Sequence, residues 1–162
     1  MSDNIPGADI ILLTYNKYMY TEYCLNALLQ TGLRPLRVII VDNGSTDRTR
    51  ELITVFSEKA AENGIETAVI LNKENRGAVT GRNQALALIR NPYVIFIDND
   101  VVSPSPDWAS DLISFLQSHE TAGAVSPKLI YPIEPFLIQC AGCDVSPTGK
   151  VNFRGRGVQH KD

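Results

Sequence analysis

The feature that most constrains this chain is a set of four short apolar runs without polar alternation. They occupy residues 10–13, 38–41, 68–71 and 94–97 and consist almost entirely of aliphatic side chains. A strand with one exposed face alternates apolar and polar residues, whereas a strand covered on both faces does not. The runs therefore predict buried strands of a parallel sheet. With 162 residues, 44% of them hydrophobic, the chain can cover such a sheet within one domain spanning residues 1–162.

Segments with helical spacing of apolar residues lie between and after these runs. The first stops at Gly32, the second begins after Asp47 and stops at Gly64, the third covers about residues 78–89, and the fourth covers residues 107–117. A glycine just past a periodic segment is a common helix stop. Strand and helix in alternation predict an α/β fold, with a mostly parallel, doubly wound sheet and helices on both faces.

The pattern weakens after residue 123. Residues 124–126 are a candidate fifth strand and residues 137–140 a candidate short further strand, whereas residues 148–162 match no finished element. We therefore expect a sheet that is incomplete on its C-terminal side.

Charge and hydropathy exclude some classes of partner. The net charge is −3 and the pI is near 5.4, so no general attraction draws the chain to nucleic acid or acidic lipid. The start of the chain is polar, and the apolar run that follows is too short for a signal peptide or a membrane span. These observations predict a cytoplasmic location, and peripheral contact of a longer protein with a membrane stays open.

The three cysteines are Cys24, Cys140 and Cys143, and they cannot all pair within the chain. An odd, small number suits a reducing compartment. Cys140 and Cys143 have the spacing of a redox pair or half a zinc site, but neither a second pair nor a histidine cluster accompanies them. We expect two unpaired small residues in a loop or strand.

Polar residues follow each of the four apolar runs. The residues singled out are Thr14, Tyr15 and Asn16; Asp42, Asn43, Gly44 and Ser45; Asn75, Gly77 and Arg82; and Asp98, Asn99 and Asp100. Parallel strands all end at one edge of a sheet, and ligands of open α/β sheets bind at that edge. The sequence therefore predicts one binding site built from all four groups.

Asp98 and Asp100 give the sharpest signal within that site. Two carboxylates that are two residues apart repel each other unless a cation or proton lies between them, and hard oxygen ligands suit Mg²⁺ or Mn²⁺. Such a metal would bridge to phosphates. The alternative is an exposed acidic turn.

Asp42 ends its strand next to a loop rich in amides and hydroxyls. We expect the loop to hold the edge of a ligand while Asp42 accepts a hydrogen bond from a base imide or a ribose hydroxyl. Asp47 is as well explained as a helix cap.

Gly77 and Gly81 lie at the start of the third predicted helix, together with Arg82. A glycine-rich helix start favours anions, and an arginine adds charge. The alternative is that the glycines serve packing and Arg82 lies on the surface. Neither the nucleotide-binding P-loop motif nor the dinucleotide-binding glycine motif occurs, which disfavours P-loop hydrolysis and dinucleotide redox chemistry.

The succession of residues 12–16, 41–47, 75–77, 81–83 and 96–100 resembles the family 2 glycosyltransferases of the GT-A fold. The order and spacing agree over about the first 130 residues, which is more specific than any single motif. The resemblance implies a fold like that of other nucleotide-diphospho-sugar transferases. It also implies an inverting transfer of a sugar from a nucleotide-diphosphate sugar to an acceptor hydroxyl.

The resemblance also implies roles for individual residues. Thr14 and Tyr15 would line the nucleotide site, and Asp42 would contact the base, usually uracil or thymine, so that a UDP- or dTDP-sugar is the expected donor. The acceptor in the full-length protein would be a glycan or a lipid-linked glycan.

The resemblance places the diphosphate and the metal at the other strand ends. Arg82 would face the diphosphate or the sugar. Asp98 would face ribose or metal, and Asp100 would be the main ligand of Mn²⁺ or Mg²⁺.

The catalytic base of this family usually belongs to an acidic pair well beyond the metal motif. The acidic residues after Asp100 are Asp107, Asp111, Glu120, Glu134, Asp144 and Asp162, and none forms such a pair. We therefore expect the donor half of the enzyme, in which acceptor binding and the base are missing.

Three other functions were weighed. Residues 95–101 look like the nucleophile motif of haloacid-dehalogenase-type phosphatases, but that motif ends the first strand of its domain, and Lys128 is a poor match for the lysine that it needs. A nucleotidyltransferase would carry a glycine-rich, lysine-bearing loop after the first strand, and none is found. A non-catalytic nucleotide-binding module stays open.

Overall fold

The computed structural model describes residues 5–161. The polar start at residues 1–4 and the terminal Asp162 lie outside the described residues. The chain divides into two compact units, Met1–Ser114 and Phe115–Asp162, which are described separately below. The expected organisation as a single domain stays a prediction.

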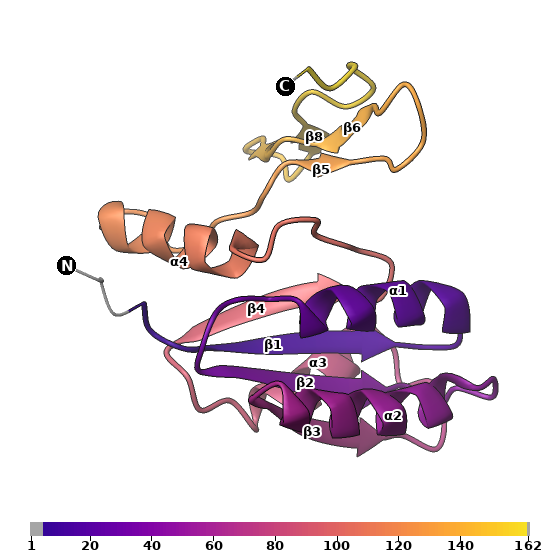
Figure 1. Ribbon diagram of the computed structural model, residues 1–162. Helices are drawn as coiled ribbons and strands as arrows, with labels where there is room; N and C mark the ends of the chain where they lie inside the picture. The colour runs from indigo at the N-terminus through magenta and orange to yellow at the C-terminus, as the bar shows by residue number, and fades with distance from the viewer. Residues whose placement is uncertain (1–4, 162) are drawn as a thin grey trace. The chain divides into compact units, whose positions relative to one another are not determined.

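The first unit contains one four-stranded parallel sheet. Its strands are β1 (Ala8–Thr14), β2 (Leu36–Asp42), β3 (Ile65–Leu71) and β4 (Tyr93–Asp98). Figure 1 shows them side by side in the order β3-β2-β1-β4, pointing the same way. Each predicted apolar run lies inside one strand, which confirms the predicted α/β class and the parallel sheet. Strand order reverses at β1, because β2 and β4 flank it on opposite sides, and such a reversal is where open α/β sheets bind ligands.

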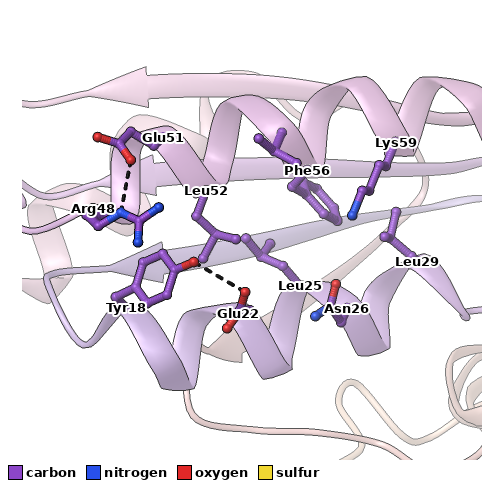
Figure 2. Close-up of a pocket in the computed structure, with 11 residues that line it drawn as sticks. Tyr18, Glu22, Leu25, Asn26, Leu29, Arg48, Glu51, Leu52, Phe56 and Lys59 are labelled. Atoms are coloured by element: carbon purple, nitrogen blue, oxygen red, sulfur yellow. Dashed lines mark hydrogen bonds and ion pairs between the residues drawn. The ribbon is translucent and has the colours of Figure 1, made fainter.

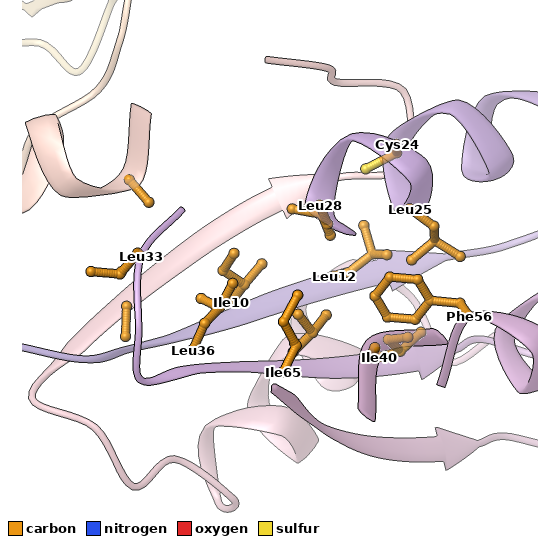
Figure 3. Packing of buried hydrophobic residues seen from close by; sticks show 14 of the residues in the cluster. Ile10, Leu12, Cys24, Leu25, Leu28, Leu33, Leu36, Ile40, Phe56 and Ile65 are labelled. Atoms are coloured by element: carbon orange, nitrogen blue, oxygen red, sulfur yellow. The ribbon is translucent and has the colours of Figure 1, made fainter. Parts of the chain in front are cut away.

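Helices cover both faces of this sheet, as predicted. They are α1 (Tyr18–Leu29), α2 (Thr49–Glu62), α3 (Ala78–Leu86) and α4 (Trp108–Ser118), the last of which crosses the boundary between the units. Alternate residues of a strand point to opposite faces. On one face Leu12 packs with Leu25 of α1 and Phe56 of α2 (Figure 3). On the other face Ile11 clusters with Ala85 of α3. Full burial of each such aliphatic side chain contributes roughly 1.5–3 kcal/mol.

The third helix ends three residues earlier than predicted. Beyond Leu86 the backbone N–H groups of Arg90 and Asn91 donate to the carboxylate of Asp9, at 2.6 and 2.7 Å, instead of continuing the helical ladder. Pro92 follows and disfavours helical geometry at the residue before it. A buried carboxylate from β1 therefore terminates this segment.

The second unit consists of two small antiparallel pairs. They join β5 (Leu129–Ile130) to β6 (Ile138–Cys140) and β7 (Cys143–Val145) to β8 (Val151–Phe153). The predicted strand at residues 137–140 is confirmed as β6. The candidate strand at residues 124–126 is wrong, because Pro127 follows it without an N–H to donate and pairing begins only at Leu129.

The expectation that residues 148–162 hold no finished element is also wrong, because β8 lies there. It pairs with β7 through a tight turn in which Ser146 N–H donates to the Lys150 carbonyl and Gly149 N–H donates to the Ser146 carbonyl, both at 2.9 Å. Gly149 takes a φ of 80°, which glycine adopts without steric cost.

The cysteines lie as expected. Cys24 is buried in α1, Cys140 is half-buried in β6 and Cys143 is exposed in β7, and all three are free thiols. No described helix is both long and apolar enough to cross a lipid bilayer.

Candidate functional site

The segment between β1 and α1 forms one wall of the predicted site. Tyr15 is 45% exposed, and Asn16 takes a left-handed backbone conformation with φ of 56°. The backbone N–H of Asn16 donates to Ser45 Oγ at 2.8 Å, and its side-chain Oδ1 accepts from the Thr46 N–H at 2.8 Å. These bonds join the loops that follow β1 and β2.

Asp47 opens both helices that follow these loops. Its carboxylate accepts from the backbone N–H of Tyr18, the first residue of α1, and of Thr49, the first residue of α2, each at 3.0 Å. Partial desolvation acts to raise the pKa of Asp47, but the hydrogen bonds from Thr49 and Tyr18 outweigh it and lower the pKa below its usual value. The helix-cap interpretation of Asp47 is confirmed.

Asp42 is completely buried at the end of β2. Its carboxylate accepts from the Ser45 N–H at 3.1 Å and from Arg50 Nε at 2.8 Å. Arg50 Nη2 donates onward to the carbonyl of Asn72, the residue after β3, at 2.7 Å. Asp42 therefore orders the Ser45 loop and holds Arg50 across two strand ends.

Asn43 and Gly44 bring the loop after β3 against the loop after β2. Asn43 Nδ2 donates to Asn75 Oδ1 at 2.8 Å, and Asn43 Oδ1 accepts from the Arg76 N–H at 3.0 Å. Gly44 has a φ of 87°, and an added Cβ would lie 2.6 Å from the backbone carbon of Glu74. Both the backbone conformation and the close approach require glycine here.

The first turns of α3 carry two glycines with different roles. Gly77 precedes the helix with φ of 79° and has open space around its Cα, as the edge of a ligand site would need. At Gly81 an added Cβ would lie 2.6 Å from Leu13 Cδ1, so this glycine lets α3 approach β1. The packing interpretation is therefore confirmed for Gly81. Arg82, which the same alternative placed on the surface, has a side chain 34% exposed, and its Nη2 donates to Asp98 Oδ1 at 2.5 Å.

The turn after β4 presents Asp98 and Asp100 outward and Asn99 inward. The side chain of Asp98 is 61% exposed, and Asp100 is exposed too. Asn99 Nδ2 donates to Thr21 Oγ1 at 2.8 Å and to Thr14 Oγ1 at 3.3 Å. The turn therefore offers two carboxylates to solvent and uses the residue between them as its anchor.

The donor set of this turn fits a hard divalent cation. Among residues 5–161 no group of three or more histidine, cysteine or acidic side chains is poised to hold a metal. Magnesium-type sites commonly take only one or two carboxylates, and phosphate oxygens and water complete the shell. Asp98 and Asp100 supply two carboxylates of the kind that such a site uses.

An open hollow of about 440 Å³ lies beside this turn and is lined by Arg82, Phe96, Ile97 and Asp98. A separate hollow of about 230 Å³ lies between α1 and α2 (Figure 2). Two polar pairs line that second hollow, Tyr18 with Glu22 and Arg48 with Glu51. None of the predicted site residues lines it, so the strand ends are the stronger candidate.

The predicted residues form two sets that meet at the ends of β1 and β2. Hydrogen bonds join the Asn16, Asn43, Ser45 and Asn75 loops in one set, and the other set holds Thr14, Arg82, Asp98 and Asn99. The backbone N–H of Asn43 donates to the Thr14 carbonyl at 2.8 Å and joins the two sets.

Sequence analysis missed Arg50 and Thr21, which support these sets. Thr21 left a signal, because it lies four residues before Leu25 on the buried face of α1. A polar residue at an apolar position of a helix needs a buried partner.

Cys24 lies directly behind the turn, and its reactivity is a test of this packing. Its Sγ lies 3.7 Å from the Asp98 carbonyl, and burial, with the charges of Asp100 and Asp98, raises the pKa of the thiol to about 12. Relative to the ordinary value of 9.0, that shift lowers the thiolate fraction near pH 8 about a thousandfold. Iodoacetamide at pH 8 is therefore expected to label exposed Cys143 while Cys24 stays unmodified until the protein is unfolded, as read by peptide mass spectrometry. Equal labelling of both cysteines in the folded protein would contradict the burial of Cys24.

Comparison with known proteins identifies the family of this chain. The family model described as Glycosyl transferase family 2 matches residues 9–141. The chain belongs to this family. Glycosyltransferase AglE of Haloferax volcanii is 29% identical to the family 2 chain over 110 residues, which is 67% of this chain and 34% of AglE.

Two solved structures share the fold of the family 2 chain. One is the mannosyltransferase PcManGT from Pyrobaculum calidifontis in complex with GDP-Man and Mn²⁺, with a TM-score of 0.63 and 23% identity over 77% of this chain and 34% of that one. The other is S. aureus TarS (residues 1–349) in complex with UDP-GlcNAc, with a TM-score of 0.62 and 23% identity over 78% of this chain and 38% of that one. The family 2 chain also spans only 26–39% of the length of three curated glycosyltransferases that it matches.

Proposed function

We propose that this family 2 chain binds the nucleoside diphosphate sugar donor of an inverting, metal-dependent sugar transfer. The observation that carries the proposal is the cluster of Arg82, Asp98 and Asp100 at the reversal of strand order. A cationic side chain and two outward carboxylates at this edge suit a diphosphate that binds together with a divalent cation. GDP-Man with Mn²⁺ and UDP-GlcNAc, as bound by the two similar structures, belong to this ligand class.

The diphosphate end of the donor binds at α3 and the turn after β4. Mn²⁺ or Mg²⁺, when bound there by Asp98 and Asp100, would offset the charge on the departing nucleoside diphosphate. Arg82 forms an ion pair with Asp98, one of the two proposed metal ligands. Its guanidinium is therefore placed to bind phosphate oxygens in a charge-assisted contact. Gly77 leaves room for a phosphate at the start of α3.

The nucleoside end of the donor binds at the loops after β1 and β2. Tyr15 exposes a ring on which a base can stack, and Asn16 and Ser45 are held at the rim by their mutual hydrogen bond. Asp42 is proposed to recognise the base, uracil or thymine, through the loop that it orders. Because its carboxylate is buried against Ser45 and Arg50, a direct contact requires one of them to move.

The residues that bind the acceptor substrate, and the carboxylate that takes its proton, are proposed to belong to a longer protein. Direct displacement forms a bond between the acceptor oxygen and the anomeric carbon as the bond to the phosphate oxygen breaks, and the acceptor proton passes to a carboxylate. We assign no residue of this chain to that carboxylate. A glycan or lipid-linked glycan as acceptor and a cytoplasmic location stay predictions.

The proposal is tested by calorimetric binding and thermal stability with UDP, dTDP and GDP, each with Mn²⁺, with Mg²⁺ and with EDTA. A ligand at 100 times its dissociation constant adds about 2.7 kcal/mol of stability. Stabilisation by a pyrimidine diphosphate that disappears with EDTA is the expected result. A folded chain that responds to none of these ligands would contradict the proposal.

The variant Asp42→Asn separates nucleoside recognition from metal binding. It keeps the size of the side chain but removes the charge that pairs with Arg50, so we expect roughly tenfold weaker binding of UDP in EDTA, where the metal makes no contribution. Glu51→Gln is the matched control, because Glu51 is an exposed carboxylate of α2, the helix that carries Arg50. UDP affinity of Asp42→Asn equal to that of the control would show that Asp42 takes no part in recognition.

A further inference from the structure

The turn that carries Asp98 and Asp100 rests on a buried polar cluster. The Asn99 amide nitrogen Nδ2 donates to Thr21 Oγ1 at 2.8 Å and to Thr14 Oγ1 at 3.3 Å. The two hydroxyls lie 3.0 Å apart, and Thr14 and Thr21 are only 1% and 0% exposed. The two hydroxyls are therefore shielded from water, and they hold the half-buried Asn99 amide from the side of β1 and α1.

Thr21 connects this cluster to the rest of the site. Its hydroxyl also donates to the carbonyl of Lys17, at 3.3 Å, in the left-handed segment that leads from β1 into α1. Three residues later on the same face of α1, Cys24 Sγ contacts the Asp98 carbonyl at 3.7 Å. One helix face therefore holds the turn both through the side chain of Asn99 and through its backbone.

The backbone of the turn positions the two carboxylates, and Asp98 also forms an ion pair with Arg82. The side chain of Asp98 is 61% exposed and Asp100 is exposed, so neither is held by packing around it. Groups that orient metal ligands from behind typically change metal affinity 10- to 100-fold when they are removed.

We propose that Thr21 is a positioning residue, which fixes the Asp98–Asp100 turn through Asn99 and so sets its affinity for a divalent cation bound with a diphosphate. This inference rests on the proposed function of the site. Thr21 touches neither the cation nor the donor and acts only through Asn99.

The test compares Thr21→Val, Thr21→Ser and the wild-type chain in calorimetric titrations with UDP. Valine keeps the branched shape and removes the hydroxyl, so UDP affinity in the presence of Mn²⁺ is expected to fall roughly tenfold, with little change in EDTA. Serine restores the hydroxyl and is expected to restore the affinity. Loss of UDP affinity in EDTA as large as the loss in Mn²⁺ would overturn the positioning role, because the defect would then not concern the metal.

Thr31→Val is the matched control. Thr31 is also a buried threonine, 2% exposed, and its hydroxyl accepts from Trp108 Nε1 at 3.1 Å, away from the turn. Thr31→Val is expected to lose stability but to keep the Mn²⁺-dependent affinity of the wild type. An equal loss of that affinity in Thr21→Val and Thr31→Val would overturn the inference.

Hydrogen–deuterium exchange of the peptide that covers residues 97–101 supplies a readout without metal or nucleotide. Its amides are expected to exchange faster in Thr21→Val than in the wild type and in Thr31→Val, and unchanged exchange would overturn the positioning role. If the wild-type chain binds no nucleoside diphosphate, the proposed function fails, whereas the exchange result still decides whether Thr21 holds the turn.

Discussion

Replacing Asp100 by alanine is expected to remove the metal-dependent part of donor binding while the fold stays intact. Asp98 is already paired with Arg82, so Asp100 is the carboxylate left to a cation. Loss of one of only two protein ligands is expected to weaken the Mn²⁺-dependent affinity for a nucleoside diphosphate about 100-fold, which corresponds to roughly 2.7 kcal/mol. Affinity in EDTA is expected to stay at the wild-type value.

Stability measurements separate this effect from unfolding. Asp100 is exposed, and its side chain makes no hydrogen bond or ion pair with the described residues, so its removal is expected to change the free energy of unfolding by less than about 0.5 kcal/mol. Asp111→Ala is the control, because it removes another exposed aspartate, on α4, with the same change in charge. Metal-dependent affinity of Asp100→Ala equal to that of Asp111→Ala would refute the metal site.

The sheet was predictable because its signal is local. Runs such as residues 38–41 contain no polar residue, and a strand of that composition is stable only when both of its faces are covered. Parallel pairing then follows from the helices between the runs, and parallel pairing brings all strand ends to one edge. The order of elements therefore predicts the edge of the sheet at which the candidate site lies.

The internal arrangement of the site was not predictable in the same way. That Asn99 turns inward while Asp98 and Asp100 face outward depends on how α1 lies against the end of β4. The residues in contact there, Thr21 and Asn99, are 78 positions apart in the chain. The complete burial of Asp42 likewise depends on Arg50, which reaches back from α2. Contacts between distant segments leave no spacing pattern in a single sequence.

The β7–β8 hairpin was missed although its signal is present. Ser146, Pro147 and Gly149 occupy the first, second and fourth positions of a four-residue turn, as type I turns favour. The flanking strands have only three residues each, too few for alternation to stand out. Turn chemistry, and not hydrophobic periodicity, was the informative feature there.

Asp9→Ala is expected to have the largest effect on stability. Asp9 lies in β1, near the end of the strand opposite to the candidate site. Asp9 is completely buried, and its carboxylate accepts from the N–H groups of Arg90 and Asn91 and lies 3.9 Å from the guanidinium of buried Arg37. Removing one partner of a buried ion pair typically costs about 3–5 kcal/mol, a large share of the roughly 5–15 kcal/mol that stabilises a domain. Urea denaturation followed by circular dichroism measures the loss.

Two further variants assign the cause of that loss. Glu66 also pairs with Arg37, and Arg37 Nε lies 2.9 Å from Glu66 Oε1, but the Nε–H is not aligned for a hydrogen bond. Because Glu66 is 54% exposed, Glu66→Gln is expected to lower the free energy of unfolding by less than about 1 kcal/mol. The double variant Asp9→Ala with Arg37→Met removes the buried cation together with its partner. It is expected to be more stable than Asp9→Ala alone, because no buried cation is left with only the exposed carboxylate of Glu66 to offset it. A double variant no more stable than Asp9→Ala would mean that Asp9 acts by ending α3 and ordering the loop before β4, and not by neutralising Arg37.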